Sequence, residues 1–245
     1  MALDPIEKKP LRRFFPGSMI LSVGRYGCNL RCPFCQNHEI SWSAEAFAYA
    51  DHAESVTPEE LASAAIRLKN RKNIGLAFTY NEPLIGWEFV RDTSRMIHAA
   101  GLKTVLVTNG TAELAVLEAL APYIDAMNID LKGFTGHYYT HVLGGSLDMV
   151  KAFIARAAQI CHVELTTLIV PGENDSIEEM RAMSAWISGL KDTGGDAIGR
   201  EIPLHISRFF PRFHMTDRPA TEVKAIYHLA EIARENLRYV YTGNC

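Results

Sequence analysis

Short apolar runs alternate with amphipathic stretches along most of this chain. Six of the runs predict β-strands, and these are mostly unbroken rather than alternating in polarity, as is typical of parallel strands covered on both faces. The predicted strands are Met19–Val23, Gly75–Tyr80, Lys103–Thr108, Ala126–Asp130, Val163–Val170 and Leu204–Phe209.

Helical patterns fill the segments between these runs. Thr57 and Glu60 form a capping box with Pro58 at the first helical position, which marks the start of a helix. Ser176 has a Glu three residues later and marks another start in the same way. The other predicted helices are Pro83–Ala100, a segment capped by Thr111, Ser146–Gln159 and about Pro219–Leu237.

Six strand–helix units in series predict an α/β fold with a parallel sheet. A closed barrel of this kind has eight units, so six predict an open, partial (β/α)6 TIM-like barrel. Its wide side then needs a partner, a substrate or the terminal segments to cover it. Because the 245 residues contain no convincing linker, we expect residues 1–245 to form a single domain.

Composition and charge narrow the possible functions. Hydrophobic residues make up 48% of the chain and charged residues 22%, which is an ordinary globular balance. The formal net charge of −3 argues against nucleic-acid binding by electrostatics. No apolar run reaches the length of a membrane span, and Met1–Phe15 is charged rather than signal-like. We therefore expect no membrane association and a cytoplasmic location.

Three of the five cysteines, Cys28, Cys32 and Cys35, lie in one loop directly after the first predicted strand. Thiolates are soft donors that select iron–sulfur clusters, zinc or copper. This spacing lets one loop place three sulfurs on three irons of a cubane and leaves the fourth iron with an open position. The other cysteines, Cys161 and Cys245, stand alone.

Two other interpretations of the cysteine loop stay open at this point. A structural zinc site needs four ligands, and His38 could complete a Cys3His set, although zinc ligands are more often spaced as two pairs. Three inert buried cysteines are the other alternative, but Asn29, Arg31 and Asn37 make the loop polar for a core segment. The cluster interpretation is favoured over both.

The Cys-x3-Cys-x2-Cys loop, with the aromatic Phe34 before its third cysteine, resembles the signature of the radical S-adenosylmethionine (SAM) superfamily. The rest of the chain resembles its glycyl-radical-enzyme activating branch, of which the pyruvate formate-lyase activating enzyme is the type. Within that branch the chain is most similar to the AmmeMemoRadiSam-associated group. The segments that carry this resemblance are Asp4–Leu11, Cys35–Asn37, Tyr80–Pro83, Pro171–Asp175 and His205–Pro211.

The resemblance implies an oxidoreductase with one [4Fe-4S] cluster, held by Cys28, Cys32 and Cys35. It implies reductive cleavage of SAM to methionine and a 5′-deoxyadenosyl radical, which then takes a hydrogen atom from a substrate. In activating enzymes that hydrogen comes from a glycine Cα of a partner protein, and a flavodoxin or ferredoxin supplies the electron. No protein acid or base is needed, so no catalytic residue is predicted.

The resemblance further implies a SAM site at the ends of the predicted strands. Glu82 matches the position that accepts the SAM amino group, and Asp130 and Lys132 match a pair that binds the methionine part. Thr108 matches a position beside the SAM carboxylate or a bound cation. The implied SAM contacts are Phe34, Asn81, Glu82, Thr108, Asn109, Asp130, Lys132 and His205.

Each of these positions also has a simpler explanation. Glu82 suits the first turn of any helix, and Asn109 suits a plain turn. Asp130 and Lys132 could form a surface ion pair. His205, matched to a contact with adenosine, could be a satisfied core histidine. Relatives with a cation site carry Asp just before the matching Thr, and the Val107 found here puts such a site in question.

Other functions compete with the activating-enzyme interpretation. A radical SAM enzyme that modifies a small molecule or RNA would share the cluster but not the protein partner. A zinc-binding Cys3His structural module would have neither cluster nor SAM. A plain aldolase-like barrel would use a lysine such as Lys132 to attack a carbonyl substrate.

Overall fold

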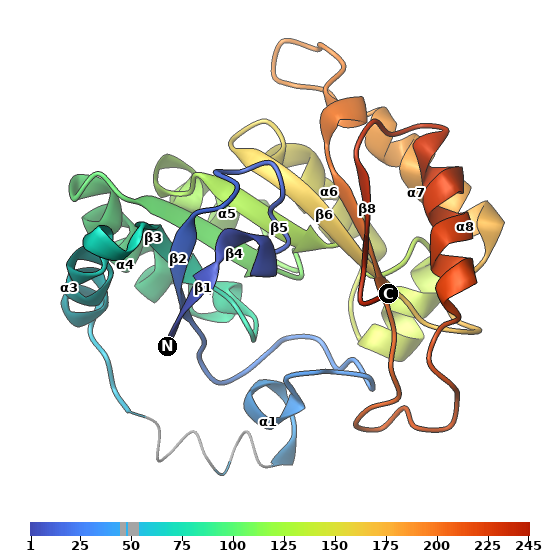
Figure 1. The fold of residues 1–245 in the computed structure, drawn as a ribbon, viewed down its shortest axis with the longest axis horizontal. Coiled ribbons are helices and arrows are strands. Elements are labelled where there is room, and N and C mark those ends of the chain that lie inside the picture. The colour runs from blue at the N-terminus through green and yellow to red at the C-terminus, as the bar shows by residue number, and fades with distance from the viewer. Residues whose placement is uncertain (45–47, 49–53) are drawn as a thin grey trace.

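The computed structural model describes residues 1–44, 48 and 54–245 of the chain (Figure 1). The described residues form one sheet of eight strands that lie side by side in chain order. The first pair is antiparallel and every later pair is parallel. The strands are β1 (Ala2–Pro5), β2 (Met19–Val23), β3 (Asn73–Phe78), β4 (Lys103–Thr108), β5 (Ala126–Asp130), β6 (His162–Ile169), β7 (Leu204–Arg208) and β8 (Val240–Gly243).

The sheet is an open, partial barrel, as predicted. It curves from β1 on one side to β8 on the other (Figure 1), and no pairing joins these two strands within the described ranges. The six predicted strands correspond to β2 through β7, and the structure adds one strand at each edge. β1 and β8 have four residues each, which is too short to show a period in polarity.

Helices cover the outer face of the sheet (Figure 1). Two predicted starts are confirmed, because the Thr57 hydroxyl accepts from the Glu60 amide and Ser176 caps its helix in the same way. Thr111 was wrong as a cap, since the third helix begins after Glu113. The helices are α1 (His38–Ser41), α3 (Pro58–Arg67), α4 (Trp87–Ala99), α5 (Leu114–Leu120), α6 (Leu147–Ala157), α7 (Ile177–Ser188) and α8 (Val223–Arg234).

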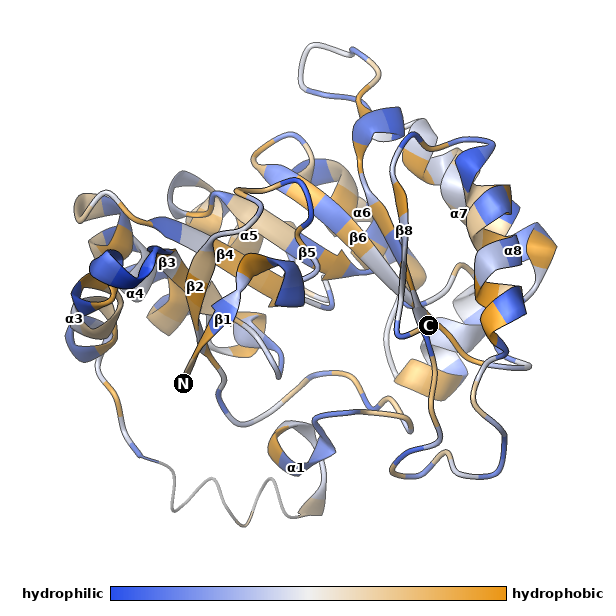
Figure 2. Ribbon diagram, in the orientation of Figure 1, coloured by the Kyte–Doolittle hydropathy of each residue, from blue (hydrophilic) through white to orange (hydrophobic). Residues whose placement is uncertain are grey.

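The helices bury one face each, and their colours in Figure 2 alternate between hydrophobic and hydrophilic around α7 and α8. In α8 the buried positions include Ile226, Leu229 and Ala233. The predicted helix Pro83–Ala100 consists of a 3-10 turn at Pro83–Gly86 followed by α4. The apolar side chains between the helices and the outer face of the sheet form the main core.

The N-terminal segment after β1 fills the inside of the barrel. Its buried side chains Ile6, Leu11 and Phe14 pack against the inner face of the sheet, which is formed here by small and branched residues of four strands: Ile20, Ala77, Val105 and Ala126. Because side chains alternate across a strand, the residues that follow Ile20 and Ala126, Leu21 and Met127, belong to the outer core instead. The chain itself therefore closes one end of its barrel.

Glu164 on β6 fixes this N-terminal segment to the barrel wall. Its carboxylate has no exposed surface and accepts the backbone amides of Arg12 at 3.0 Å and Arg13 at 2.8 Å. The ring nitrogens of His162 and His205 lie 3.0 and 2.7 Å from the same carboxylate. A buried carboxylate needs this number of partners to stay ionised.

Acid should weaken the fold through Glu164. Burial alone raises the pKa of this carboxyl group, but its bonds to His162, His205 and the two amides outweigh burial and lower the pKa from 4.5 to about 2. A group with a depressed folded-state pKa stabilises the fold above its unfolded pKa and loses that contribution as the pH falls. Between pH 4.5 and about 2, we expect this group to remove on the order of 3 kcal/mol from the free energy of unfolding. Urea titrations at successive pH values would measure the loss, and Glu164→Gln should flatten it.

Candidate functional site

A cavity of about 710 Å³ opens at the carboxyl ends of the parallel strands. This is the end at which parallel barrels carry their functional sites, and the volume is typical of sites for cofactor-sized molecules. The cysteine loop and the ends of β3 through β7 line it. The predicted site residues that it brings together are Cys28, Cys32, Phe34, Cys35, Asn81, Glu82, Thr108, Asn109, Asp130 and Lys132.

His205 is the one predicted site residue that the structure does not place in this cavity. Its side chain is buried, with a ring nitrogen 2.7 Å from Glu164 and its ring centroid 5.2 Å from that of Tyr241. The structure therefore agrees with the simpler alternative, in which His205 is a core histidine with a satisfied partner, rather than with the predicted contact to adenosine.

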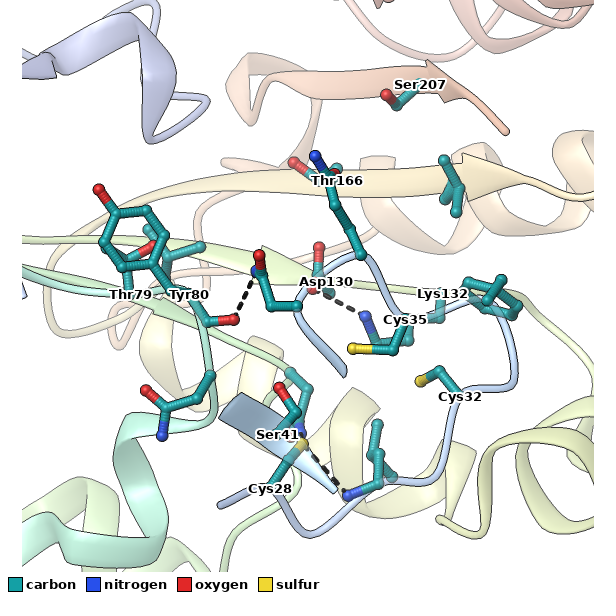
Figure 3. Close-up of a pocket in the computed structure, with 18 of the residues that line it drawn as sticks. Cys28, Cys32, Cys35, Ser41, Thr79, Tyr80, Asp130, Lys132, Thr166 and Ser207 are labelled. Atoms are coloured by element: carbon teal, nitrogen blue, oxygen red, sulfur yellow. Dashed lines mark hydrogen bonds and ion pairs between the residues drawn. The ribbon is translucent and has the colours of Figure 1, made fainter. Parts of the chain in front are cut away.

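The three clustered cysteines face one another across the cysteine loop (Figure 3). Cys32 is buried, and Cys28 and Cys35 are half-buried. Burial raises the pKa of Cys28 to about 11 and that of Cys32 to about 12, so these thiols keep their protons unless a bound metal displaces them into solvent. The arrangement suits metal ligands better than reactive free thiols.

The arrangement of the three cysteines does not suit a single metal ion that all of them would bind. Within the described part of the chain, no three His, Cys, Asp or Glu side chains lie close enough to hold one ion. The ring of His38, the fourth ligand of the zinc alternative, stacks on Phe213 with centroids 4.2 Å apart and does not line the cavity. Three sulfurs that surround a common space but do not share one ion fit a cluster, in which each binds its own iron.

Asparagine side chains tie the cysteine loop to the strand ends. Asn81, after β3, accepts the Arg25 amide at 2.9 Å and donates to the Gly27 carbonyl at 2.9 Å. Asn109, after β4, donates to the Asn29 side chain at 2.9 Å and lies 3.8 Å from the Cys28 sulfur. Both residues were predicted as SAM contacts, and in the structure their side-chain amides hold the loop that carries the three cysteines.

Aromatic residues hold the loop from the other side. The Trp42 indole of the α1 segment donates to the Cys32 carbonyl at 3.3 Å, and the His214 amide donates to the Pro33 carbonyl at 2.8 Å. Phe213 lies between them with a φ of 54°, a left-handed conformation that is rare for a bulky residue. The sequence offered no signal for this contact, because it joins segments far apart in the chain.

Tyr80 connects the cavity to the N-terminal segment. Its φ of 75° lies in the left-handed region that favours glycine, a strain that proteins concentrate at functional sites. Its hydroxyl donates to Asp4 at 2.8 Å, and the buried Lys9 ammonium lies 4.6 Å from its ring centroid. Its carbonyl accepts from Asn37 at 2.6 Å, next to the third cysteine of the loop.

Glu82 joins the ends of β3 and β4. The carboxyl group is buried and accepts the Thr108 hydroxyl at 2.7 Å, the Asn109 amide at 2.7 Å and the Leu84 amide at 2.9 Å. Burial raises its pKa to about 7, although these three hydrogen bonds act in the opposite direction. Glu82 thus caps the 3-10 turn that follows it, as in the simpler alternative, and it also lies on the cavity wall.

Asp130 and Lys132 form an ion pair, which is the simpler alternative to the SAM contact that the resemblance implies, and both side chains line the cavity wall. The ammonium nitrogen lies 2.8 Å from Oδ2 of Asp130 (Figure 3). Burial alone lowers the pKa of Lys132, but the charge and hydrogen bond of Asp130 outweigh burial and hold the pKa well above its usual value. A nucleophilic lysine needs the opposite shift, which argues against the aldolase alternative.

A family model described as the radical SAM superfamily matches residues 24–183 of the chain. The chain belongs to the radical SAM superfamily. The match includes the cysteine loop and strands β3 through β6. The partial barrel is the fold of this family, and the family is expected to bind SAM and a [4Fe-4S] cluster.

Relatives place the chain in the activating-enzyme-like branch of the superfamily. It is 38% identical over 247 residues to an uncharacterized protein of Methanocaldococcus jannaschii, a match that covers 100% of this chain and 69% of that protein. It is 25% identical over 170 residues to a pyruvate formate-lyase-activating enzyme of Clostridium pasteurianum, 68% of each. The corresponding Escherichia coli K12 enzyme is 26% identical over 185 residues, 73% of this chain and 71% of that enzyme.

Solved structures share the fold at low sequence identity. SuiB of Streptococcus suis bound to S-adenosylmethionine superposes with a TM-score of 0.68 at 13% identity, over 92% of this chain. SuiB bound to the precursor peptide SuiA gives 0.67 at 14% identity, over 98% of this chain. This chain spans 51% of each of those chains, so these likenesses bear on the fold alone.

The residues of the cavity fit the cofactors of the family. Three cysteine sulfurs offer soft ligands for three irons and leave no fourth cysteine on the described cavity wall to close the cluster. A paired acid and base, Asp130 and Lys132, stand beside them with polar groups from two further strands.

No helix in the described ranges is long and apolar enough to cross a membrane.

Proposed function

We propose that this chain is an activating-enzyme-like radical SAM enzyme that takes a hydrogen atom from a glycine of a partner protein. The observation that carries the proposal is the meeting, in one cavity, of three cysteine sulfurs with the polar ends of β3, β4 and β5. A metal site of purely structural purpose would need no such cavity.

In this proposal each part of the cavity has a role. Cys28, Cys32 and Cys35 bind the cluster, and Asp130 and Lys132 orient the amino-acid part of SAM. Glu82 and its partner Thr108 keep the strand ends fixed beside the cluster. When bound, a reduced cluster supplies the electron that cleaves SAM to methionine and a 5′-deoxyadenosyl radical. The protein orients the reactants and excludes water from the cavity.

Two findings support a protein substrate. Several relatives are activating enzymes, among them a 4-hydroxyphenylacetate decarboxylase activating enzyme of Clostridioides difficile, 25% identical over 154 residues. The barrel is also open, since β1 and β8 are not paired within the described residues, and in this proposal a protein loop reaches the cavity from that open side. The electron donor in this proposal is a flavodoxin or a ferredoxin.

Anaerobic reconstitution tests the proposed chemistry directly. The purified chain is loaded with iron and sulfide, reduced with dithionite and incubated with SAM, and the products are separated by chromatography. We expect 5′-deoxyadenosine and methionine in equal amounts. A chain that binds the cluster but releases no 5′-deoxyadenosine would contradict the proposal.

The partner is tested separately, by incubation with a candidate glycyl-radical enzyme and electron paramagnetic resonance. A glycyl radical signal on the partner is expected only when both SAM and reductant are present. Turnover of SAM that leaves every candidate protein unchanged, yet rises with RNA or a small molecule, would favour the other substrate classes.

A further inference from the structure

One part of the cavity wall is cationic and has no role in the proposed SAM site. It is formed by the N-terminal segment, the end of β7 and the segment that follows β7, and its four cationic residues are Lys8, Lys9, Arg208 and Arg212. Glu82 and Asp130 are the two carboxylic acids that line the cavity among the described residues. Because the whole chain has a net charge of −3, this excess of positive charge is local and favours an anion in the cavity.

The two arginines are the cations without a carboxylate partner. Both lysines reach Asp4, with Lys9 at 2.9 Å and Lys8 at 3.4 Å. Neither Arg208 nor Arg212 forms an ion pair with any residue that the structure describes. Arg212 is exposed, whereas Arg208 is half-buried at the end of its strand. Arg208 is therefore the more defined of the two.

Contacts hold the Arg208 side chain in place. Its Nε donates to the Thr221 carbonyl, and its guanidinium carbon lies 4.7 Å from the centroid of the Phe210 ring. Thr221 is itself buried, and its hydroxyl donates to the Ile169 carbonyl at 2.6 Å. The two terminal nitrogens of the guanidinium have no partner in the described part of the chain.

A guanidinium fixed through Nε, with both terminal nitrogens free, matches an anion that presents two oxygens. We infer that Arg208 binds an oxyanion of the substrate, a carboxylate or a phosphate, in the part of the cavity beyond the cysteine loop. This inference deepens the proposed function and rests on it for the identification of the cavity as the substrate site. For a protein substrate, it places an Asp or Glu close to the glycine that enters.

The carboxylate of SAM is a less suitable occupant for Arg208. The proposed SAM contacts lie at the ends of β3, β4 and β5, and Arg208 ends β7. With strands about 4.8 Å apart, two strand spacings separate Arg208 from Asp130 by roughly 10 Å across the sheet. Lys132 already stands beside Asp130 for the amino-acid part of SAM.

Anaerobic calorimetry on the reconstituted full chain with SAM present tests the inference. The probes are inorganic phosphate and two short amidated peptides, Ala-Gly-Asp-Ala and Ala-Gly-Asn-Ala. We expect phosphate, the Asp peptide or both to bind, and the affinity to fall at least about tenfold in Arg208→Gln. Arg208→Lys, which keeps the charge but not the fork, should lose part of the affinity. Binding of only one probe identifies the source of the oxyanion.

Arg200→Gln is the matched control, because Arg200 is exposed and lies outside the cavity. It should bind the probes as the unaltered chain does. Unchanged probe affinity in Arg208→Gln would overturn the inference, and so would a loss of SAM affinity alone. If circular dichroism shows that Arg208→Gln does not fold, the probe affinity of Arg208→Lys is compared with that of the unaltered chain, and an unchanged affinity then overturns the inference.

The two proposals fail in different ways. Absence of 5′-deoxyadenosine from the unaltered chain contradicts the proposed function, whereas the calorimetric comparison does not depend on turnover. A chain that cleaves SAM but shows equal anion affinity with and without the Arg208 guanidinium refutes only the oxyanion site.

Discussion

Replacement of Cys32 by Ala should abolish both iron binding and the formation of 5′-deoxyadenosine. Two sulfurs cannot hold a cubane that needs three, and loss of even the outer partners of a metal ligand lowers metal affinity by about 10- to 100-fold. We therefore expect at least about a 100-fold fall in product. Iron analysis after anaerobic reconstitution and product chromatography measure the two effects.

The fold should survive this substitution. Cys32 is a small side chain with 8% of its surface exposed, so its truncation should change the free energy of unfolding by only about 1 kcal/mol. Cys28→Ala and Cys35→Ala should behave in the same way. Cys161→Ala is the matched control, because Cys161 is a partly buried thiol outside the cavity whose sulfur lies 3.8 Å from the Ala157 carbonyl. Full turnover by any of the three loop variants would refute the ligand assignment.

Replacement of Glu164 by Ala should have the largest effect on stability. The substitution removes the acceptor of the Arg12 and Arg13 amides and leaves His162 and His205 without their carboxylate. Removal of one member of a buried ionic network typically destabilises a protein by about 3 to 5 kcal/mol, and we expect a loss of that size. Denaturant unfolding followed by circular dichroism measures it.

Limited proteolysis adds a local readout for the same variant. Trypsin cleaves after arginine, and although the Arg12 and Arg13 side chains are exposed, their backbone amides are held by Glu164, so cleavage between them requires the segment to be released. We expect much faster cleavage there in Glu164→Ala than in the unaltered chain. Glu201→Ala is the control, since Glu201 is 56% exposed and pairs with Arg238 on the surface, so it should cost at most about 1 kcal/mol. Equal cleavage in both variants would mean that Glu164 does not hold the segment.

The bounds of a strand were predictable to the residue where its apolar run is followed directly by turn or charged residues. Lys103–Thr108 is an apolar run followed by Asn-Gly, and Ala126–Asp130 is a short run that ends on a charged pair, so both strands matched their predicted bounds. The three cysteines were predictable as one site because they lie in one loop. Their shared cavity with Glu82 and Lys132 followed from the rule that parallel strands end at one edge.

Contacts between distant segments were not predictable. The irregular spacing of Ile6, Leu11 and Phe14 gives no period, so nothing in the sequence marks them as the filling of the barrel. The sequence left His205 as either an adenosine contact or a core histidine, and only the register of β6 and β7 shows Glu164 beside it. The loop contacts of Asn81 and Asn109 were missed because they join side-chain amides to groups in another segment.

The contact between Arg12 and Glu164 spans 152 residues, and this separation bears on how the chain folds during synthesis. The N-terminal segment leaves the ribosome first, but its binding partner on β6 emerges only after most of the chain has been made. Closure of so long a loop is slow, so the inside of the barrel should be completed late. Until then Ile6, Leu11 and Phe14 stay exposed to other chains, so a chaperone that covers them should raise the yield of folded protein.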